Sequence, residues 1–373
     1  MSQISQKDRV KGALIGTIVG DALGVGPHWY YDLDELRSEY GNWIDTYMPP
    51  KKSTRFPDVW KARQDLKEGA VSQTGQIFIL LLESIVKSGS YDELDFTERL
   101  DNLLHTLDGT ASGGRYTDEA MRDVWHGRKE GLDWSHVGGL GYTPTAAIRS
   151  TIIAALYARN PHQAVRHVFS NIELTHRNPL IIGQSLSYAM TIIALINGIS
   201  IPDVSTTLRK WNQEEKLPFP LRKRKRKRTD QPSSWMMPVT WSDLAVEEHN
   251  FTDSVGQISS IYKAAHNPAI KIEPPSAACQ LFGLQCLMGF VLPGAYYMVS
   301  RFEDNFEMAV LSAINGGGNN MARAALTGAL SGSIVGLSGI PEKFVHGLAD
   351  HERLLKLAEQ VADISTRFNR GDN

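Results

Sequence analysis

Apolar residues recur at three- and four-residue spacing along almost the whole chain, and strand-like alternation is hardly present. This period is typical of helices that bury one face, so it predicts an all-α protein. The expected helices span 8–24, 76–88, 95–106, 116–130, 144–158, 161–170, 179–197, 202–215, 253–266, 275–290, 304–314, 321–337 and 349–367. Prolines near expected starts, such as Pro144 and Pro161, and glycines just past expected ends, such as Gly198 and Gly339, support these boundaries.

Two of these segments carry glycine at every fourth position. The glycines are Gly12, Gly16, Gly20 and Gly24 near the start, and Gly328, Gly332 and Gly336 near the end. A glycine inside a helix costs on the order of 1 kcal/mol relative to alanine, so a repeated spacing needs a packing reason. Small residues one turn apart form a flat face that permits close backbone approach. We therefore expect the two segments to pack together and to bring the polar clusters at 21–32 and 316–320 into one cleft.

Two regions lack helical periodicity. Residues 41–74 are rich in Pro, Trp, Lys and Asp, and we expect a loop beside the cleft. Residues 216–252 contain the basic run Arg222–Arg228 and are expected to form a surface insertion. Such a run is either a solvated loop, a polyanion-binding segment or a nuclear import signal. No linker divides the middle of the chain, so we expect a single domain over 1–373.

Composition narrows the functional classes. The chain has 373 residues, 42% of them hydrophobic, and a formal net charge of -2, which argues against a general nucleic-acid binder. The two cysteines, Cys279 and Cys286, lie in an apolar run and exclude a disulfide framework. The first residues lack an apolar signal core, which favours an intracellular, cytoplasmic protein. Polar residues interrupt the apolar stretches 180–201 and 280–300, so we expect buried helices there and no membrane partner.

Several short motifs follow one another along the chain. They are Gly20–Gly24 (Gly-Asp-Ala-Leu-Gly), His28–Asp32 (His-Trp-Tyr-Tyr-Asp), Thr175–Pro179 (Thr-His-Arg-Asn-Pro), and Gly317–Asn320 followed by Arg323. In order and spacing, these motifs resemble the ADP-ribosylglycohydrolase family, and more closely its crystallin J1 and selenoprotein J branch. The resemblance covers nearly the whole chain and implies a compact, orthogonal multi-helix, all-α fold.

The chain departs from the family pattern at the metal ligands. Active members of the family hold two magnesium ions with a Thr/Ser-Asp-Asp triplet and an Asp-x-Asp-Thr motif. The matching positions here are Ser72–Gln76 and Asn319–Ala322, and neither contains an acid. Magnesium prefers hard oxygen ligands with negative charge, and the thioether of Met321 is soft. We therefore expect no dinuclear magnesium site and no cofactor.

The resemblance also indicates which residues lie near the cleft. Asp21, Asp32 and His28 are the candidates for general acid and base chemistry. The candidates for ligand binding are Trp29, Tyr31, Gln76, Asp118, His176, Asn319, Asn320 and Arg323. Structural roles remain open for several of them: Asp21 could pair at the end of its helix, and Trp29 and the histidines could belong to the core. Arg323 either grips an anionic ligand or forms an ion pair with Asp21.

Three functions fit these observations. The first is an ADP-ribosylglycohydrolase-like protein that lacks the metal site and keeps a cleft for a small ligand, such as an ADP-ribose-like molecule or another anion. The second is a metal-independent enzyme of the hydrolase or lyase type that uses the altered cleft. The third is a crystallin-like structural protein with a vestigial cleft.

Overall fold

Helices account for the regular structure of the protein in this computed structural model, which describes residues 4–56, 60–213, 217 and 246–368. Within these residues no strand occurs, and an isolated bridge joins Gly139 to His176. The all-α prediction is therefore confirmed. The first half contains α1 (Gln6–Val25), α2 (Leu33–Tyr40), α4 (Gln73–Ser88), α5 (Glu93–Leu104), α6 (Glu119–Lys129), α7 (Thr145–Leu156), α8 (Pro161–Glu173) and α9 (Pro179–Ile196). The second half contains α10 (Ile201–Gln213), α11 (Val246–His266), α12 (Ala278–Phe282), α13 (Met288–Arg301), α14 (Phe306–Asn315), α15 (Asn320–Val335), α16 (Glu342–His346) and α17 (His351–Ser365).

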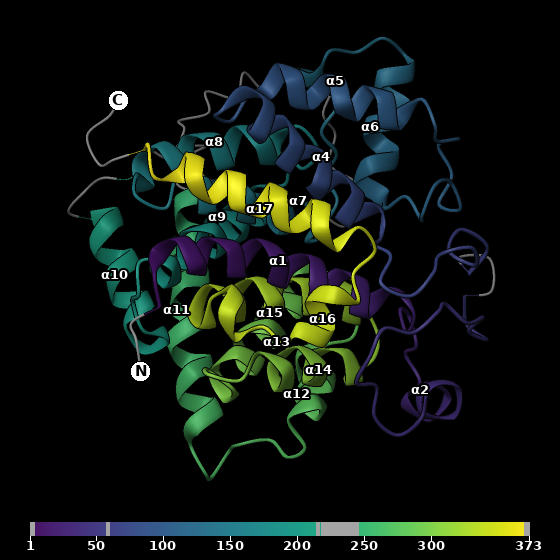
Figure 1. The fold of residues 1–373 in the computed structure, drawn as a ribbon, viewed down its shortest axis with the longest axis vertical. Helices are drawn as coiled ribbons and strands as arrows, with labels where there is room; N and C mark the ends of the chain where they lie inside the picture. Colours follow the sequence, from purple (N-terminus) through teal and green to yellow (C-terminus); the bar gives the residue numbers. More distant parts are fainter. Residues whose placement is uncertain (1–3, 57–59, 214–216, 218–245, 369–373) are drawn as a thin grey trace.

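The central feature of the fold is the pairing of α1 with α15 (Figure 1). A Cβ atom built on Gly16 would lie 2.2 Å from the carbonyl oxygen of Gly328, and one on Gly12 would lie 2.2 Å from that of Gly332. Only glycine allows two backbones to approach this closely. The expected contact between the glycine-spaced segments is confirmed, and its antiparallel register places the end of α1 beside the start of α15. Gly336 differs from the other glycines because it ends α15 with φ +73° instead of lying inside the helix.

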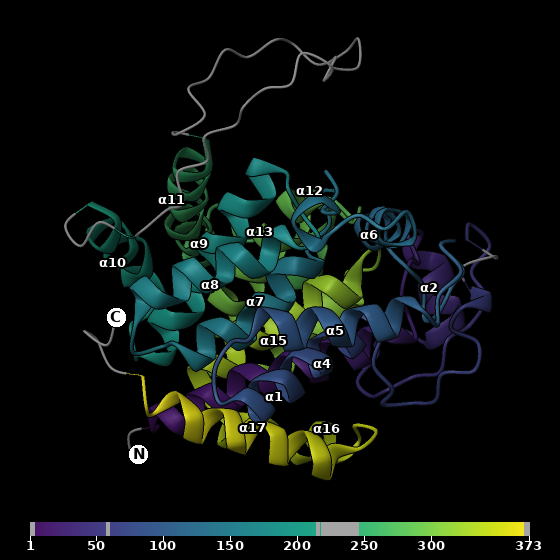
Figure 2. The ribbon, with the colours of Figure 1, turned by 90° about the horizontal axis from the view of Figure 1, so that it is seen from above.

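The other helices surround this pair. α17 packs along α1, α13 and α14 pack against α15, and α7 and α9 contact both central helices. In the two views, α2 and α6 lie at the same end of the molecule, where α1 finishes (Figures 1 and 2).

Polar residues cap the starts of several helices. Ser72 accepts a hydrogen bond from the Gly75 amide at the start of α4, and Asp118 accepts one from the Met121 amide at the start of α6.

The expected helix over 275–290 is wrong. α12 ends at Phe282 and is followed by Gly283, which has φ +114°, and α13 begins only at Met288 and continues to Arg301. A left-handed residue cannot continue a helix, so the apolar run is divided in two. The short helices α2 and α16 were not expected. The basic run Arg222–Arg228 lies outside the described residues, but the last part of the expected insertion 216–252 belongs to α11, which begins at Val246.

The apolar helix α9 is long and apolar enough to cross a membrane by length and composition. In this fold 89% of the 18 residues of α9 are buried, and the helices that contact α9 include α7, α8 and α11. The prediction of buried helices in the two apolar stretches is confirmed for α9 and for α13, most of whose residues are also buried.

Candidate functional site

The loop after α1 and the loop before α15 are joined by two backbone hydrogen bonds. The Trp29 amide donates to the Gly318 carbonyl at 3.1 Å, and the Gly318 amide donates to the Tyr30 carbonyl at 2.6 Å. Gly317 and Gly318 both have positive φ, at +69° and +62°, a conformation that favours glycine. The two polar clusters therefore meet at the end of the α1–α15 pair, as the sequence predicts.

A cavity of about 170 Å³ lies beside this junction, and we call it the cleft cavity. It is lined by His28, Trp29, Arg63, Ser72, Gln73, Thr74, Ile77, Arg115, Tyr116, Asp118, Glu119, Met121, Arg122, Thr143, Pro144, Thr145, Cys286, Asn319, Met321 and Ala322. Both segments that resemble the family's metal motifs, 72–76 and 319–322, thus contribute residues to the lining of this cavity. The expected loop over 41–74 contributes Arg63 and Ser72, and it ends as α4 begins.

Three buried nitrogens around the cleft cavity have no hydrogen-bond partner among the described residues. They are Trp29 Nε1, Gln73 Nε2 and Arg63 Nε, and each of these side chains is at most 9% exposed. All three are donors. Burying a donor without a partner is costly, so such groups in a folded protein call for an explanation. A ligand rich in oxygen acceptors would satisfy them.

Asp118 is held at the cleft cavity by a buried chain of hydrogen bonds. Arg149 Nη2 donates to Thr175 Oγ1 at 2.8 Å, and Thr175 contacts His176 Nδ1 at 2.8 Å. His176 Nε2 lies 3.0 Å from Thr143 Oγ1, which donates to Asp118 Oδ2 at 2.8 Å. Burial lowers the pKa of His176 and so favours its neutral form, which donates at Nε2 and accepts at Nδ1. His176 therefore orients Asp118 through Thr143 and does not itself line the cavity.

Asp21 lies behind the cleft cavity, where it holds the start of α4. Its Oδ1 accepts from the Ser72 hydroxyl at 2.6 Å, and its Oδ2 accepts from the Ser72 amide at 2.8 Å. Burial raises the pKa of Asp21 to about 6, although the hydrogen bonds from Ser72 and the charge of Arg115 act in the opposite direction. The pairing alternative for Asp21 is thus realised with Ser72.

His28 reaches the cleft cavity as a neutral ring. Burial and the neighbouring charge of Arg63 lower the pKa of His28 well below its usual value. Asn320 Nδ2 donates to the carbonyls of Pro27 and Ile314, so Asn320 Oδ1 is the acceptor for His28 Nδ1–H at 3.3 Å. This tautomer leaves Nε2 as a hydrogen-bond acceptor, and a ring with so low a pKa is poorly suited to donate a proton.

Seven of the eleven sequence-predicted residues do not line the cleft cavity. Asp21, His176 and Asn320 are among them and form the hydrogen bonds described above; the other four lie elsewhere. Asp32 is exposed and caps α2 by accepting from the amides of Asp34 and Glu35. Tyr31 packs against Phe56 and Arg55. Gln76 lines a different pocket, and Arg323 is fully buried. The acid–base role of Asp32 and the binding roles of the others remain predictions.

The ion pair expected as one alternative for Arg323 is wrong. The Arg323 guanidinium donates to the carbonyls of Ala313 and Gly317, at distances of 2.5 to 3.2 Å. Asp21 meanwhile accepts from Ser72, and the described residues contain no ion pair between Asp21 and Arg323. Arg323 therefore stabilises the glycine-rich loop before α15, because its donors satisfy carbonyls that the turn leaves unpaired.

Trp29 combines a core position with a place at the cleft cavity. Its ring centroid lies 4.4 Å from that of Tyr116, 5.0 Å from that of His28 and 5.3 Å from that of Phe56. Trp29 and Tyr116 both have positive φ, at +71° and +80°, which is uncommon for bulky residues. Such backbone strain in two residues that line one cavity is frequent at functional sites.

Sequence reasoning missed the positive charge around the cleft cavity. Arg63, Arg115 and Arg122 line it, and none of them belongs to a motif that carried the resemblance. Arg63 lies in the irregular region 41–74, and the other two flank the start of α6. No local pattern distinguishes these arginines from surface residues, since tertiary contacts alone bring them together.

The described residues form no cluster of side chains that could bind a metal ion. Throughout that part of the chain, no group of three or more His, Cys, Asp or Glu side chains lies close enough to hold one. Cys286 lines the cleft cavity, but burial raises the pKa of its thiol and so disfavours the nucleophilic thiolate.

Comparisons with known proteins agree with this architecture. The sequence model of the ADP-ribosylglycohydrolase family matches residues 2–370. An uncharacterized protein from Archaeoglobus fulgidus is 23% identical over 362 residues, which cover 97% of this chain and 98% of that protein. A solved structure described as an ADP-ribosylglycohydrolase-related protein complex superposes with a TM-score of 0.60 at 15% identity, over 97% of this chain and 100% of that chain. At that identity the structural likeness shows the fold alone.

Proposed function

Because this chain belongs to the ADP-ribosylglycohydrolase family, we propose that its cleft cavity binds an ADP-ribose-like or related anionic ligand without a dinuclear magnesium site. The observation that carries the proposal is the set of unpartnered donors on Trp29, Gln73 and Arg63. Phosphate and ribose oxygens are acceptors of the kind that these donors lack. Arg115 and Arg122 add positive charge at the same cavity, which favours an anionic ligand.

The ligand set around the cleft cavity does not fit two magnesium ions. Segments 72–74 and 319–321 offer hydroxyl groups, amides and a thioether, whereas magnesium favours carboxylates. Both oxygens of Asp21 accept from Ser72. Asp118 Oδ1 caps α6, and its Oδ2 accepts from the hydroxyls of Thr143 and Thr145. Asp21 thus accepts two hydrogen bonds within the protein and Asp118 accepts three, so we derive no metal-dependent step.

The size of the cleft cavity limits what it can enclose. Its volume of about 170 Å³ is below the range of about 300–1,000 Å³ that is usual for pockets that bury a whole drug-sized ligand. We therefore infer that the cavity holds one moiety, a ribose or a phosphate, while the rest of the ligand extends from its mouth.

The same donors argue against a purely structural protein. A vestigial cleft has no reason to retain buried polar groups without partners, because each destabilises the fold. The motif order at 28–32 and 175–179 supports a place in the crystallin J1 and selenoprotein J branch, but the cleft cavity favours ligand binding within that branch.

A matched pair of substitutions in α4 tests the proposal. Gln73→Leu removes a donor at the cleft cavity that has no protein partner, whereas Gln76→Leu makes the same change one turn along the helix, at a side chain that lines a different pocket. Isothermal titration with ADP-ribose should show about tenfold weaker binding for Gln73→Leu, because a hydrogen bond to a charged acceptor contributes about 1.5–3 kcal/mol. Gln76→Leu should bind as the wild type does. Equal affinities for both variants would contradict the proposed site.

A further inference from the structure

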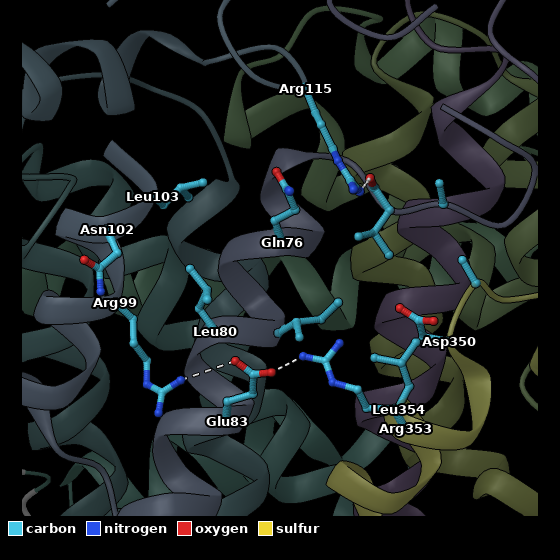
Figure 3. Close-up of a pocket in the computed structure, with 14 residues that line it drawn as sticks. Gln76, Leu80, Glu83, Arg99, Asn102, Leu103, Arg115, Asp350, Arg353 and Leu354 are labelled. Carbon is cyan, nitrogen blue, oxygen red and sulfur yellow. Dashed lines mark hydrogen bonds and ion pairs between the residues drawn. The ribbon is translucent and has the colours of Figure 1, made fainter. Parts of the chain in front are cut away.

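A second pocket of about 430 Å³ lies on the other side of α4, between α5 and the start of α17 (Figure 3). It is lined by Ala70, Val71, Gln76, Ile79, Leu80, Glu83, Arg99, Asn102, Leu103, Arg115, Ala349, Asp350, Arg353 and Leu354. Its volume falls within the range of about 300–1,000 Å³ that is usual for small-molecule sites. This pocket contains no residue of the family motifs other than Gln76.

The charges of the second pocket are unevenly paired. At one end Glu83 lies between two arginines, as Figure 3 shows: Arg99 Nη1 is 3.3 Å from Glu83 Oε2, and Arg353 contacts Glu83 Oε1. Arg99 also pairs with Asp95 at 2.6 Å. Both arginines at this end therefore already have carboxylate partners.

Arg115, at the other end, has no such carboxylate partner. Its Nη1 donates to the Val71 carbonyl at 2.6 Å, and within the described chain it forms no ion pair. Burial lowers the pKa of Arg115, although the charge of Asp21 acts in the opposite direction. A half-buried guanidinium without a carboxylate is a ready partner for an anionic group. The amide of Gln76 lies beside it (Figure 3).

Apolar side chains occupy the space between the two ends. Leu80 lies between the Arg115 end and Glu83 in Figure 3, and Leu103 and Leu354 lie to either side. Covering the apolar surface of an open pocket with an apolar ligand removes that surface from water, which favours binding. The pocket thus combines an apolar middle with one cation, Arg115, that has no ion-pair partner among the described residues, while the exposed carboxylate of Asp350 also lines it.

We propose that the second pocket binds a small carboxylic acid with an apolar body, whose carboxylate is held by Arg115. The apolar body covers Leu80 and its neighbours. The end of the pocket at Glu83, where both arginines already have carboxylate partners, bounds the site. This proposal does not rest on the proposed function of the cleft cavity. The two cavities nevertheless share Arg115, so a ligand in one changes the charge that faces the other.

Isothermal titration with octanoate tests this site, with octan-1-ol as the uncharged comparison. Octanoate should bind and octan-1-ol should bind more weakly. Arg115→Gln should weaken octanoate binding about tenfold, because a charge-assisted hydrogen bond is lost. Arg122→Gln removes the same charge from the cleft cavity alone and should leave octanoate binding unchanged.

A third variant keeps the test decisive if Arg115→Gln fails to fold. Asn102 is exposed and lines only the second pocket, so Asn102→Glu adds a negative charge at its mouth with little effect on packing. It should weaken octanoate binding several-fold. The absence of octanoate binding at millimolar concentration would overturn the proposal. Binding that Arg122→Gln weakens and Asn102→Glu does not would place octanoate in the cleft cavity and would also overturn it.

Discussion

Replacing Gly16 with alanine tests the packing on which the whole fold depends. The new Cβ atom would lie 2.2 Å from the Gly328 carbonyl oxygen, whereas ordinary van der Waals contact begins at 3.4 Å, so α1 and α15 must separate by about 1.2 Å. The obstacle is backbone, which cannot rotate away as a side chain can. Overpacking of this kind costs about 1–3 kcal/mol, and helix propensity returns about 1 kcal/mol. Because the clash is with backbone, we expect a net loss near the upper end, about 2 kcal/mol.

Gly256→Ala provides the matched control for this substitution. Gly256 also lies inside a helix, but the nearest atom to a Cβ there is Arg209 Nη2 at 3.6 Å, an ordinary contact. That variant should gain up to about 1 kcal/mol from helix propensity. Urea denaturation of both variants measures the free energies of unfolding. A Gly16→Ala protein as stable as the wild type would refute the close approach of α1 and α15.

Two further substitutions test the buried polar groups. Burial raises the pKa of Asp21 from 3.8 to about 6. Between these pH values the folded state therefore binds more protons than the unfolded state. The free energy of unfolding should fall by on the order of 2–3 kcal/mol as the pH rises through this range. Asp21→Asn should remove this fall, and identical melting profiles against pH for the two proteins would contradict it. Thr143→Val removes the nearer acceptor of His176 Nε2 and leaves only Thr145 Oγ1, at 3.5 Å. It should cost about 1–3 kcal/mol in urea denaturation, while a change below about 0.5 kcal/mol would show that the chain to Asp118 contributes little.

The start of α4 shows what periodicity could and could not predict. Apolar spacing predicts this helix from residue 76, but the Ser72 cap begins it at Gln73. Because each residue turns the helix by about 100°, the three-residue difference matters for which side chains reach the cleft cavity. Gln73 and Ile77, four residues apart, face the cleft cavity, and Gln76 faces the second pocket. The cap adds residues 73–75 to the helix, and Gln73 and Thr74 among them reach the cleft cavity; spacing that starts at the first apolar residue does not reveal them.

Long-range partners were harder to predict than helices. The glycine spacing contained enough information to pair α1 with α15, since few other arrangements explain it. The partners of Arg323 are carbonyls of a turn whose shape depends on Gly317 and Gly318, and no local pattern encodes that shape. Asp32 caps a helix of eight residues, α2, which is too short to show a clear apolar period.

Magnesium dependence tests the proposed cleft most directly. Isothermal titration of the wild-type protein with ADP-ribose, in the presence of magnesium and again after its removal by a chelator, measures whether binding requires the ion. We predict binding with the same affinity under both conditions, because the segments that resemble the family's metal motifs offer hydroxyls, amides and a thioether, and arginines from elsewhere in the chain line the same cavity. Binding that appears only with magnesium would contradict the metal-free cleft, and the absence of binding under both conditions would contradict the cleft as a site for this ligand.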